Sequence, residues 1–166
     1  GQGMQVVDVA NPQNAPIMYS VPTAPAQPRA LALSGDLLFA AADLEGLLVF
    51  DVSAPGDPRP IGCVDTPGRA WDVAVSGSYA YVADRTALQV IDFADPTAPW
   101  IVGSVETPGD AVAVATTSTH AYVADQTSLQ VIAIANPASP TIVGGVTTDA
   151  MDVAVAGSLA FVVGDS

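Results

Sequence analysis

The sequence has no lysine and only four arginines against 17 acidic residues, which gives a formal net charge of −13. Nucleic acids and anionic membrane surfaces are bound by clustered positive charge, so neither is expected as a partner. The 166 residues also include a single cysteine, Cys63, and a single histidine, His120. One cysteine excludes a disulfide within the chain, and this inventory gives little support for a Cys-His pair or a Ser-His-Asp triad. We therefore expect no catalytic residues and no enzymatic activity.

Long apolar runs and helix-favouring acids are scarce as well. No window approaches the roughly 18 apolar residues of a membrane helix, so we expect no direct membrane insertion. Of the 17 acids, 15 are Asp, and the chain contains 14 Gly and 14 Pro. These residue types favour turns over helix interiors. The composition predicts a turn-rich all-β fold, and the length allows one domain with a sizeable core.

An internal repeat organises the chain. Four short β-prone blocks recur in a fixed order, and equivalent positions in the second block, Leu38, Ala80, Ala121 and Ala160, lie 42, 41 and 39 residues apart. Four strands every 40 to 45 residues are typical of a propeller blade. The sequence therefore predicts a β-propeller of four-stranded antiparallel blades, with four repeats of about 41 residues in a single domain, 1–166.

The phase of the repeat predicts how the ring closes. Residues 4–21 correspond to third and outer strands, residues 30–64, 72–105 and 113–146 to whole blades, and residues 152–164 to first and second strands. We expect both termini to complete one blade together, which would leave no exposed sheet edge. Three arrangements remain open: a closed four-bladed ring, two chains that share an eight-bladed ring, and a piece of a longer chain.

The stretches "LLVFD" from Leu47, "LQVID" from Leu88 and "MQVVD" from Met4 carry a resemblance to a known family. With "AYVAD" before and "DP..P" after, they resemble the LVIVD repeat of bacterial and archaeal surface proteins. The resemblance implies a β-propeller in an exported protein located extracellularly, at the cell surface or in the periplasm, and it implies no defined activity. The fourth copy departs from the pattern, with Ala133 in place of the aspartate.

The loops between second and third strands and the connectors between blades should emerge on one face. Because loops on one face of a repeat protein vary while the scaffold stays fixed, this loop face is the predicted binding surface. Arg69 and Trp71 are the residues expected to dominate a contact there, with the alternative that Trp71 only plugs the top of the channel. The candidate binding residues are Arg69, Trp71, Asp72, Asp84, Arg85, Asp125, Met151 and Asp152.

Carboxylates raise the question of a metal. Asp8, Asp51 and Asp92 each precede a proline turn and are interpreted as turn caps, and Asp84 and Asp125 are more typical of turn formers than of calcium ligands. Asp72 and Asp152, expected near the axis, are the metal candidates that remain. They support an alternative function, a calcium-dependent ligand-binding or hydrolytic propeller. His120 and Cys63 occupy ordinary strand positions of the repeat.

We expect a non-enzymatic binding or scaffolding module without a cofactor. It would use its loop face or its blade edges to hold a protein partner, to join a larger surface assembly, or to form a homodimer with one shared eight-bladed ring. The acidity has a simpler explanation, solubility of an apolar chain.

Overall fold

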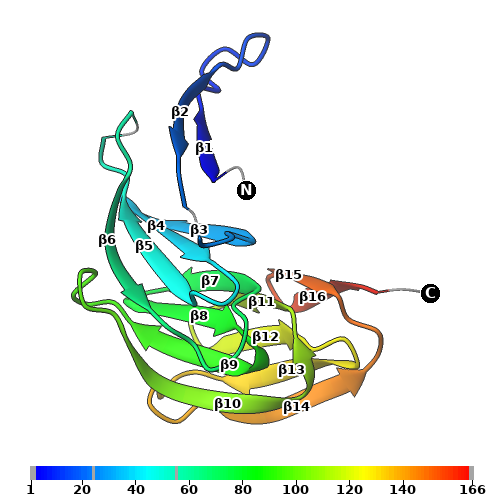
Figure 1. Cartoon of the computed structure of the whole chain (residues 1–166). Helices are drawn as coiled ribbons and strands as arrows, with labels where there is room; N and C mark the ends of the chain where they lie inside the picture. Colours follow the sequence, from blue (N-terminus) through cyan, green and yellow to red (C-terminus); the bar gives the residue numbers. More distant parts are fainter. Residues whose placement is uncertain (1–2, 24, 55, 165–166) are drawn as a thin grey trace.

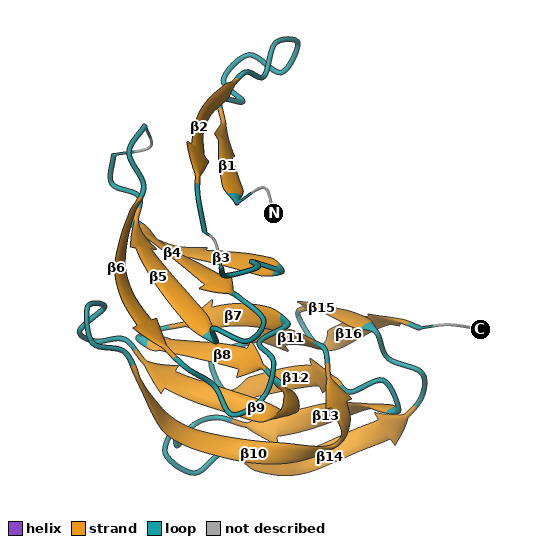
Figure 2. Cartoon of the chain, in the orientation of Figure 1, coloured by secondary structure: helices purple, strands orange, loops and turns teal. Residues whose placement is uncertain are grey.

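The computed structural model describes residues 3–23, 25–54 and 56–164. In this part of the chain the fold is all-β, and its strands form five antiparallel sheets arranged along an open arc (Figures 1 and 2). The three sheets in the middle have four strands each, and a two-stranded hairpin lies at either end. No helix in these residues is long and apolar enough to cross a bilayer.

Each sheet runs in simple chain order. Sheet 1 contains β3 (Ala30–Ser34), β4 (Leu37–Ala41), β5 (Leu47–Asp51) and β6 (Arg59–Val64). Sheet 2 contains β7 (Asp72–Ser76), β8 (Tyr79–Ala83), β9 (Arg85–Asp92) and β10 (Trp100–Ala111). Sheet 3 contains β11 (Ala113–Thr116), β12 (His120–Ala124), β13 (Ser128–Ala133) and β14 (Thr141–Thr147). The N-terminal hairpin pairs β1 (Met4–Val7) with β2 (Ile17–Val21), and the C-terminal hairpin pairs β15 (Asp152–Ala156) with β16 (Leu159–Val163).

Local structure repeats with the sequence. The three aspartates that end a third strand each accept a hydrogen bond from the backbone N–H two residues later: Asp8 from Ala10, Asp51 from Ser53, and Asp92 from Ala94, all at 2.8 Å. They are turn caps, as the sequence predicts. A register shift also recurs in every pairing of a third with an outer strand. Strand β10 continues to Ala111, beyond the predicted limit of residue 105.

The core lies between neighbouring sheets. One face of each sheet packs on the sheet that follows it, so Phe39 of sheet 1 meets Phe93 of sheet 2 with ring centroids 4.5 Å apart. The next interface is built in the same way, with Tyr81 of sheet 2 against Val114 and Ile132 of sheet 3. Side chains that point to either face of sheet 2 are therefore buried, which explains why its second strand, β8, is apolar on both faces.

Two buried carboxylates connect these sheets. Asp84 follows β8, is completely buried, and accepts five hydrogen bonds. Three come from Thr86 and Ala87 at the start of β9, one comes from the Gln89 amide, and one comes from Gly68 N in the connector between sheets 1 and 2. A side chain at Gly68 would collide with Asp84 backbone, since a Cβ there would lie 1.9 Å from its carbonyl oxygen.

Asp125 repeats this arrangement one sheet later. It too is completely buried, and it accepts from Thr127, from the Ser128 hydroxyl, and from Gly109 N near the end of β10, where the chain passes from sheet 2 to sheet 3. The segments that lead from one sheet to the next also form backbone hydrogen bonds with the loop after the second strand of the sheet they leave. Asp43 exchanges two backbone hydrogen bonds with Ala70, and Arg85 pairs with Ala111.

The predicted closure of the ring is not observed. The hairpins of residues 4–21 and 152–164 do not pair with each other and remain separate two-stranded sheets at opposite ends of the arc (Figure 1). The N-terminal hairpin packs on sheet 1 through Met4 and Val21, against Ala40 and Phe50. In sheet 1, Gly62 of β6 packs against the proline turn of sheet 2, and a Cβ there would lie 2.2 Å from the Pro96 carbonyl oxygen. β2 has Tyr19 at the equivalent position, so a proline turn cannot pack on β2 as closely.

We predict that Asp84→Ala destabilises the fold by about 3 kcal/mol or more, because it leaves several buried donors without an acceptor. Asp92→Ala is the matched control, since it removes one exposed turn hydrogen bond and should cost about 1 kcal/mol or less. Urea unfolding of both variants measures the two losses. Equal losses would show that the buried carboxylate does not hold the connector.

Candidate functional site

The last residue before each inner strand occupies an equivalent position. Arg29, Trp71, Val112 and Met151 each donate their backbone N–H to the carbonyl that ends the second strand of the same sheet, at 2.7 to 2.8 Å. These four positions therefore follow one another around the inner side of the arc, next to the neighbouring inner strands. These hydrogen bonds show that the four residues are equivalent positions of the repeat.

One carboxylate holds two arginines on this face. Arg29 donates through Nε and Nη2 to Asp43 Oδ2 at 3.2 and 2.6 Å, and Arg69 donates through Nη1 to Asp43 Oδ1 at 3.1 Å. The hydrogen bond from Arg29 is the main reason that the pKa of Asp43 lies below its usual value, and Arg69 adds to the effect. Asp43 is therefore charged at neutral pH and fixes both guanidinium groups.

Trp71 lies between two cations. The Arg29 Cζ atom is 4.6 Å from the centroid of the indole, and the Arg85 Cζ atom is 5.8 Å from it. Both distances fall within the range of a cation–π interaction. Arg85 is held in turn by Asp110, which accepts from its Nε at 3.0 Å and from its Nη2. The indole Nε1–H is buried and has no acceptor among the described residues.

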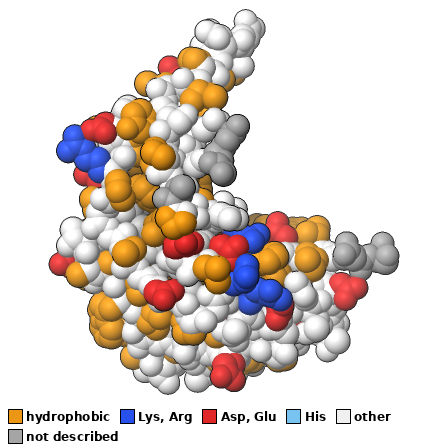
Figure 3. All heavy atoms as spheres, in the orientation of Figure 1, with side chains coloured by type: hydrophobic (Ala, Val, Ile, Leu, Met, Phe, Trp, Pro, Cys, Tyr) orange, Lys and Arg blue, Asp and Glu red, His pale blue; other side chains and the backbone are white. Residues whose placement is uncertain are grey.

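These contacts define the arginine–tryptophan cluster: Arg29, Asp43, Arg69, Trp71, Arg85 and Asp110. It contains three of the four arginines of the chain, and Figure 3 shows positive and negative side chains gathered together on one face. The three arginine side chains are 37 to 47% exposed. A pocket opens beside Arg29, Asp43 and Arg69, and its other lining residues are Pro25, Gln27, Leu44 and Glu45.

The structure brings together only part of the predicted binding surface. Arg69, Trp71 and Arg85 belong to the cluster, whereas Asp84 and Asp125 do not lie on the surface. Their side chains are completely buried and their oxygens are occupied by the hydrogen bonds that hold the connectors. The prediction that these two aspartates contribute to a contact surface is wrong, and their interpretation as turn formers is the better one. Met151 and Asp152 are exposed where the C-terminal hairpin begins.

Asp72 has a structural role at the inner strands. Its Oδ2 accepts from Val114 N of β11 at 2.8 Å, and its Oδ1 accepts from Val73 N, so it joins the inner strands of sheets 2 and 3. Burial raises the pKa of Asp72, and the charge of Asp152 raises it further. Among the described residues, no group of three or more His, Cys, Asp or Glu side chains is arranged to hold a metal ion.

The eight predicted binding residues do not include three members of the cluster, Arg29, Asp43 and Asp110, although the repeat places Asp43 and Asp110 on the loop face. A signal for Arg29 was present, because it occupies the position of Trp71 one repeat earlier. Asp43 has a positive φ of 53°, as do Arg85 and Gln126 at the same place in the next two sheets, with φ of 72° and 68°. The equivalence of Asp43 and Arg85 is obscured in the sequence because the loop of sheet 1 is one residue longer.

Comparison with known proteins gives a repeat family and a fold. The LVIVD repeat model matches residues 27–66, 67–107 and 108–148. No curated protein matches the chain. A functionally unknown protein from Desulfotomaculum acetoxidans has a similar structure, with a TM-score of 0.78 and 14% identity over 96% of this chain and 55% of the other.

Two further structures are similar. A protein from Lactobacillus plantarum matches with a TM-score of 0.73 and 18% identity over 90% of this chain and 50% of its own length. The computationally designed Ika4 protein matches with a TM-score of 0.68 and 11% identity over 85% of this chain and 87% of its own. The chain thus spans about half the length of the first two structures, and the likeness establishes the fold alone.

We predict that the pKa of Asp72 lies above 3.8 and that Asp152→Asn lowers it, because the substitution removes a nearby negative charge. Since the folded state takes up this proton at higher pH than the unfolded state does, Asp72 adds stability as the pH falls toward 3.8. Carboxyl-carbon NMR titration measures the pKa, with Asp57→Asn as a distant control. An unchanged pKa in Asp152→Asn would contradict the coupling.

Proposed function

Because this chain belongs to the LVIVD repeat family, we propose that it is a non-enzymatic binding module of an exported protein and that its loop face holds a protein partner. The repeated sheets provide a β-propeller scaffold, and the arginine–tryptophan cluster provides the contact. The resemblance of the repeats to those of bacterial and archaeal surface proteins favours an extracellular, cell-surface or periplasmic location. The acid-rich, lysine-free composition is compatible with that location.

The single observation that carries the proposal is the concentration of arginines around one tryptophan. The chain is strongly acidic, yet three of its four arginines converge on this face, where aspartates and an indole hold them in place. Fixed arginines and a tryptophan are the residue types that dominate binding energy at protein interfaces. Because their positions are set before binding, little side-chain entropy is lost when a partner docks.

The donor pattern indicates what the partner presents. Arg69 uses only Nη1 in a hydrogen bond to the described residues and its side chain is 47% exposed, so its other N–H groups are available to an acceptor on a partner. A guanidinium group pairs best with a carboxylate through two parallel hydrogen bonds. Exposed Leu44, 63% accessible, adds an apolar contact at the edge of the pocket. We therefore propose a partner segment that carries acidic residues beside aromatic or aliphatic ones.

The absence of an enzymatic role is part of the proposal. His120 and Cys63 lie on different strands of different sheets, β12 and β6. The Nδ1 atom of His120 is 2.9 Å from the Thr119 hydroxyl, in a contact within its own turn. These positions support the interpretation of both residues as strand residues of the scaffold.

We predict that a short peptide of alternating Glu and Tyr changes the fluorescence of Trp71 in a Trp100→Phe background, where Trp71 is the only tryptophan. Arg69→Ala should weaken this binding by about tenfold or more, because a charged hydrogen bond is lost. Arg59→Ala is the matched control, since Arg59 is exposed and pairs with Asp57 away from the cluster.

A peptide of alternating Lys and Tyr provides the second control. If it binds as tightly as the Glu peptide, or if Arg69→Ala has no effect, the loop face is not a carboxylate-binding surface and the proposed function is wrong.

A further inference from the structure

We propose that a pocket between sheets 2 and 3 binds a neutral sugar residue. The pocket lies on the face of sheet 3 that points toward sheet 2, and it shares no residue with the arginine–tryptophan cluster. Sugar binding here is therefore independent of the protein contact proposed for the loop face. Three features of the described residues carry it: a side chain that sheet 3 lacks, an amide oxygen held in place without a donor, and a lining without charge.

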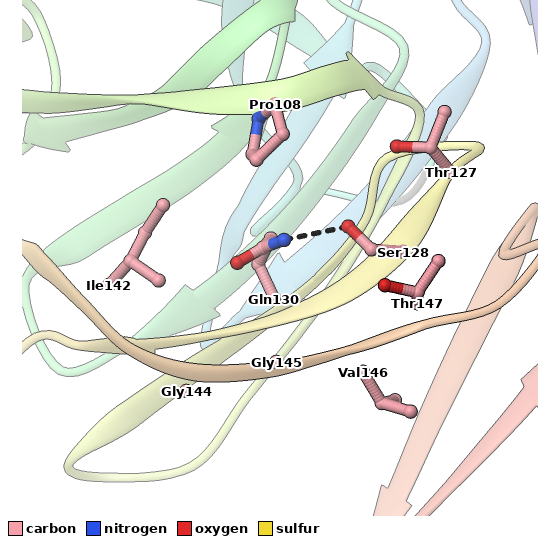
Figure 4. A pocket seen from close by; sticks show the side chains of 9 residues that line it. All are labelled: Pro108, Thr127, Ser128, Gln130, Ile142, Gly144, Gly145, Val146 and Thr147. Atoms are coloured by element: carbon pink, nitrogen blue, oxygen red, sulfur yellow. Dashed lines mark hydrogen bonds between the residues drawn. The ribbon is translucent and has the colours of Figure 1, made fainter.

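The pocket lies at the outer rim of the interface between the two sheets. Pro108 of β10 forms one side, and Gln130 of β13 with Ile142 of β14 forms the other (Figure 4). Gln130 shares its face of β13 with Ile132, which is buried in the core between sheets 2 and 3. The volume is about 410 Å³, within the range of small-ligand sites. Both walls belong to four-stranded sheets in the middle of the arc.

The pocket occurs where sheet 3 departs from sheet 2. Gln130 pairs with Gly145, whereas Gln89, at the equivalent place in sheet 2, pairs with Ser104. A Cβ on Gly145 would lie 3.0 Å from Gln130 Oε1 and 3.3 Å from Gln130 Cδ. A side chain at this position would therefore cover the amide, and glycine leaves it open to the pocket.

The amide of Gln130 is fixed with its oxygen toward the pocket. The Ser128 hydroxyl donates its single hydrogen to Asp125, at 2.8 and 2.9 Å from the two carboxylate oxygens, so it can only accept from Gln130. Gln130 Nε2 therefore faces Ser128, at 2.6 Å, and Oε1 points away from it (Figure 4). The buried carboxylate thus sets the orientation of the amide through the serine.

Gln130 Oε1 has no hydrogen-bond donor among the described residues, although Gln130 is only 8% exposed. A nearly buried carbonyl without a donor costs free energy, and a ligand that brings an O–H group to it removes that cost. Because the amide is already held in place, little side-chain entropy is lost on binding. The Thr147 hydroxyl, turned toward Gln130 in Figure 4, can donate to and accept from the same ligand.

The lining favours a ligand that is neutral and rich in hydroxyl groups. None of the nine lining residues carries a charge, and Thr147 stands where sheet 2 has Glu106. An ammonium group would lose water here without gaining a countercharge, since the oxygens of Asp125 are already occupied. A sugar ring offers hydroxyl groups to Gln130 and Thr147 while its C–H groups pack on Pro108.

Titration with D-glucose, D-galactose, D-mannose and N-acetyl-D-glucosamine, followed by heteronuclear NMR, tests the proposal. We expect at least one of these sugars to give saturable shifts of the Gln130 side-chain amide and the Gly145 backbone amide. The Kd should lie in about the millimolar range, as expected of a ligand of this size. Ethanolamine, a cation with one hydroxyl group, should give no such shifts. Saturable shifts with none of the sugars, or tighter binding of ethanolamine, would overturn the proposal.

Two variants locate the site with residues that the repeat already uses. Gly145→Ser introduces the side chain that sheet 2 has opposite its glutamine, and Gln130→Leu introduces the residue that sheet 1 has at that position. The first covers the amide and the second removes the acceptor, so each should weaken sugar binding by about tenfold or more. Thr141→Ala, exposed on β14 outside the pocket, is the matched control and should change the Kd by less than about twofold.

Circular dichroism establishes that each variant is folded, and if one is not, the other decides. A folded variant of either kind that binds the sugar as tightly as the wild type shows that the ligand lies elsewhere, and the proposal is then wrong. Equal weakening by Thr141→Ala would likewise contradict it.

Discussion

The arrangement of the sheets depends on carboxylates that have no contact with water. Asp84 and Asp125 are each surrounded by donors from the turn that follows them and from the connector that arrives from the preceding sheet. A buried carboxylate is tolerated only when its oxygens are satisfied in this way. The same side chain therefore shapes a loop and sets the position of one sheet relative to the next, and the glycines at positions 68 and 109 permit the close approach that both tasks require.

Sheet 1 has no buried carboxylate at the position of Asp84 and Asp125. Ala42 occupies the place of Asp84, and Leu48 occupies the place of Gln89, the amide that donates to Asp84 in sheet 2. Carboxylate and amide are absent together, which is expected if neither is tolerated in the core alone. The aspartate of this loop is Asp43, one position later, and it binds Arg29 and Arg69 instead. The arginine–tryptophan cluster is thus located where the repeat departs from its own pattern.

The sequence was sufficient to predict the all-β class, the four-stranded sheets and the turn caps, because these follow from residue spacing and from the chemistry of Asp, Gly and Pro. It could not separate Asp84 from Asp43, since both look like loop aspartates and only the surrounding donors distinguish a buried connector from a surface ion pair. The closure of the chain on itself was predicted from repeat phase. The repeat phase correctly predicts which strands pair within each hairpin. The two hairpins nevertheless lie apart as separate sheets, because the curvature of the arc depends on packing between sheets, which the phase does not determine.

The central claim is that the buried carboxylates hold the connectors. Native-state hydrogen exchange at the backbone amides of Gly68 and Gly109 tests it most directly, because each donates to one of these carboxylates at 3.1 to 3.2 Å. The account predicts that both amides exchange as slowly as that of Val82 in the core of sheet 2, through opening of the whole sheet. Exchange as fast as that of Ala94, an exposed turn amide bonded to Asp92, would contradict it.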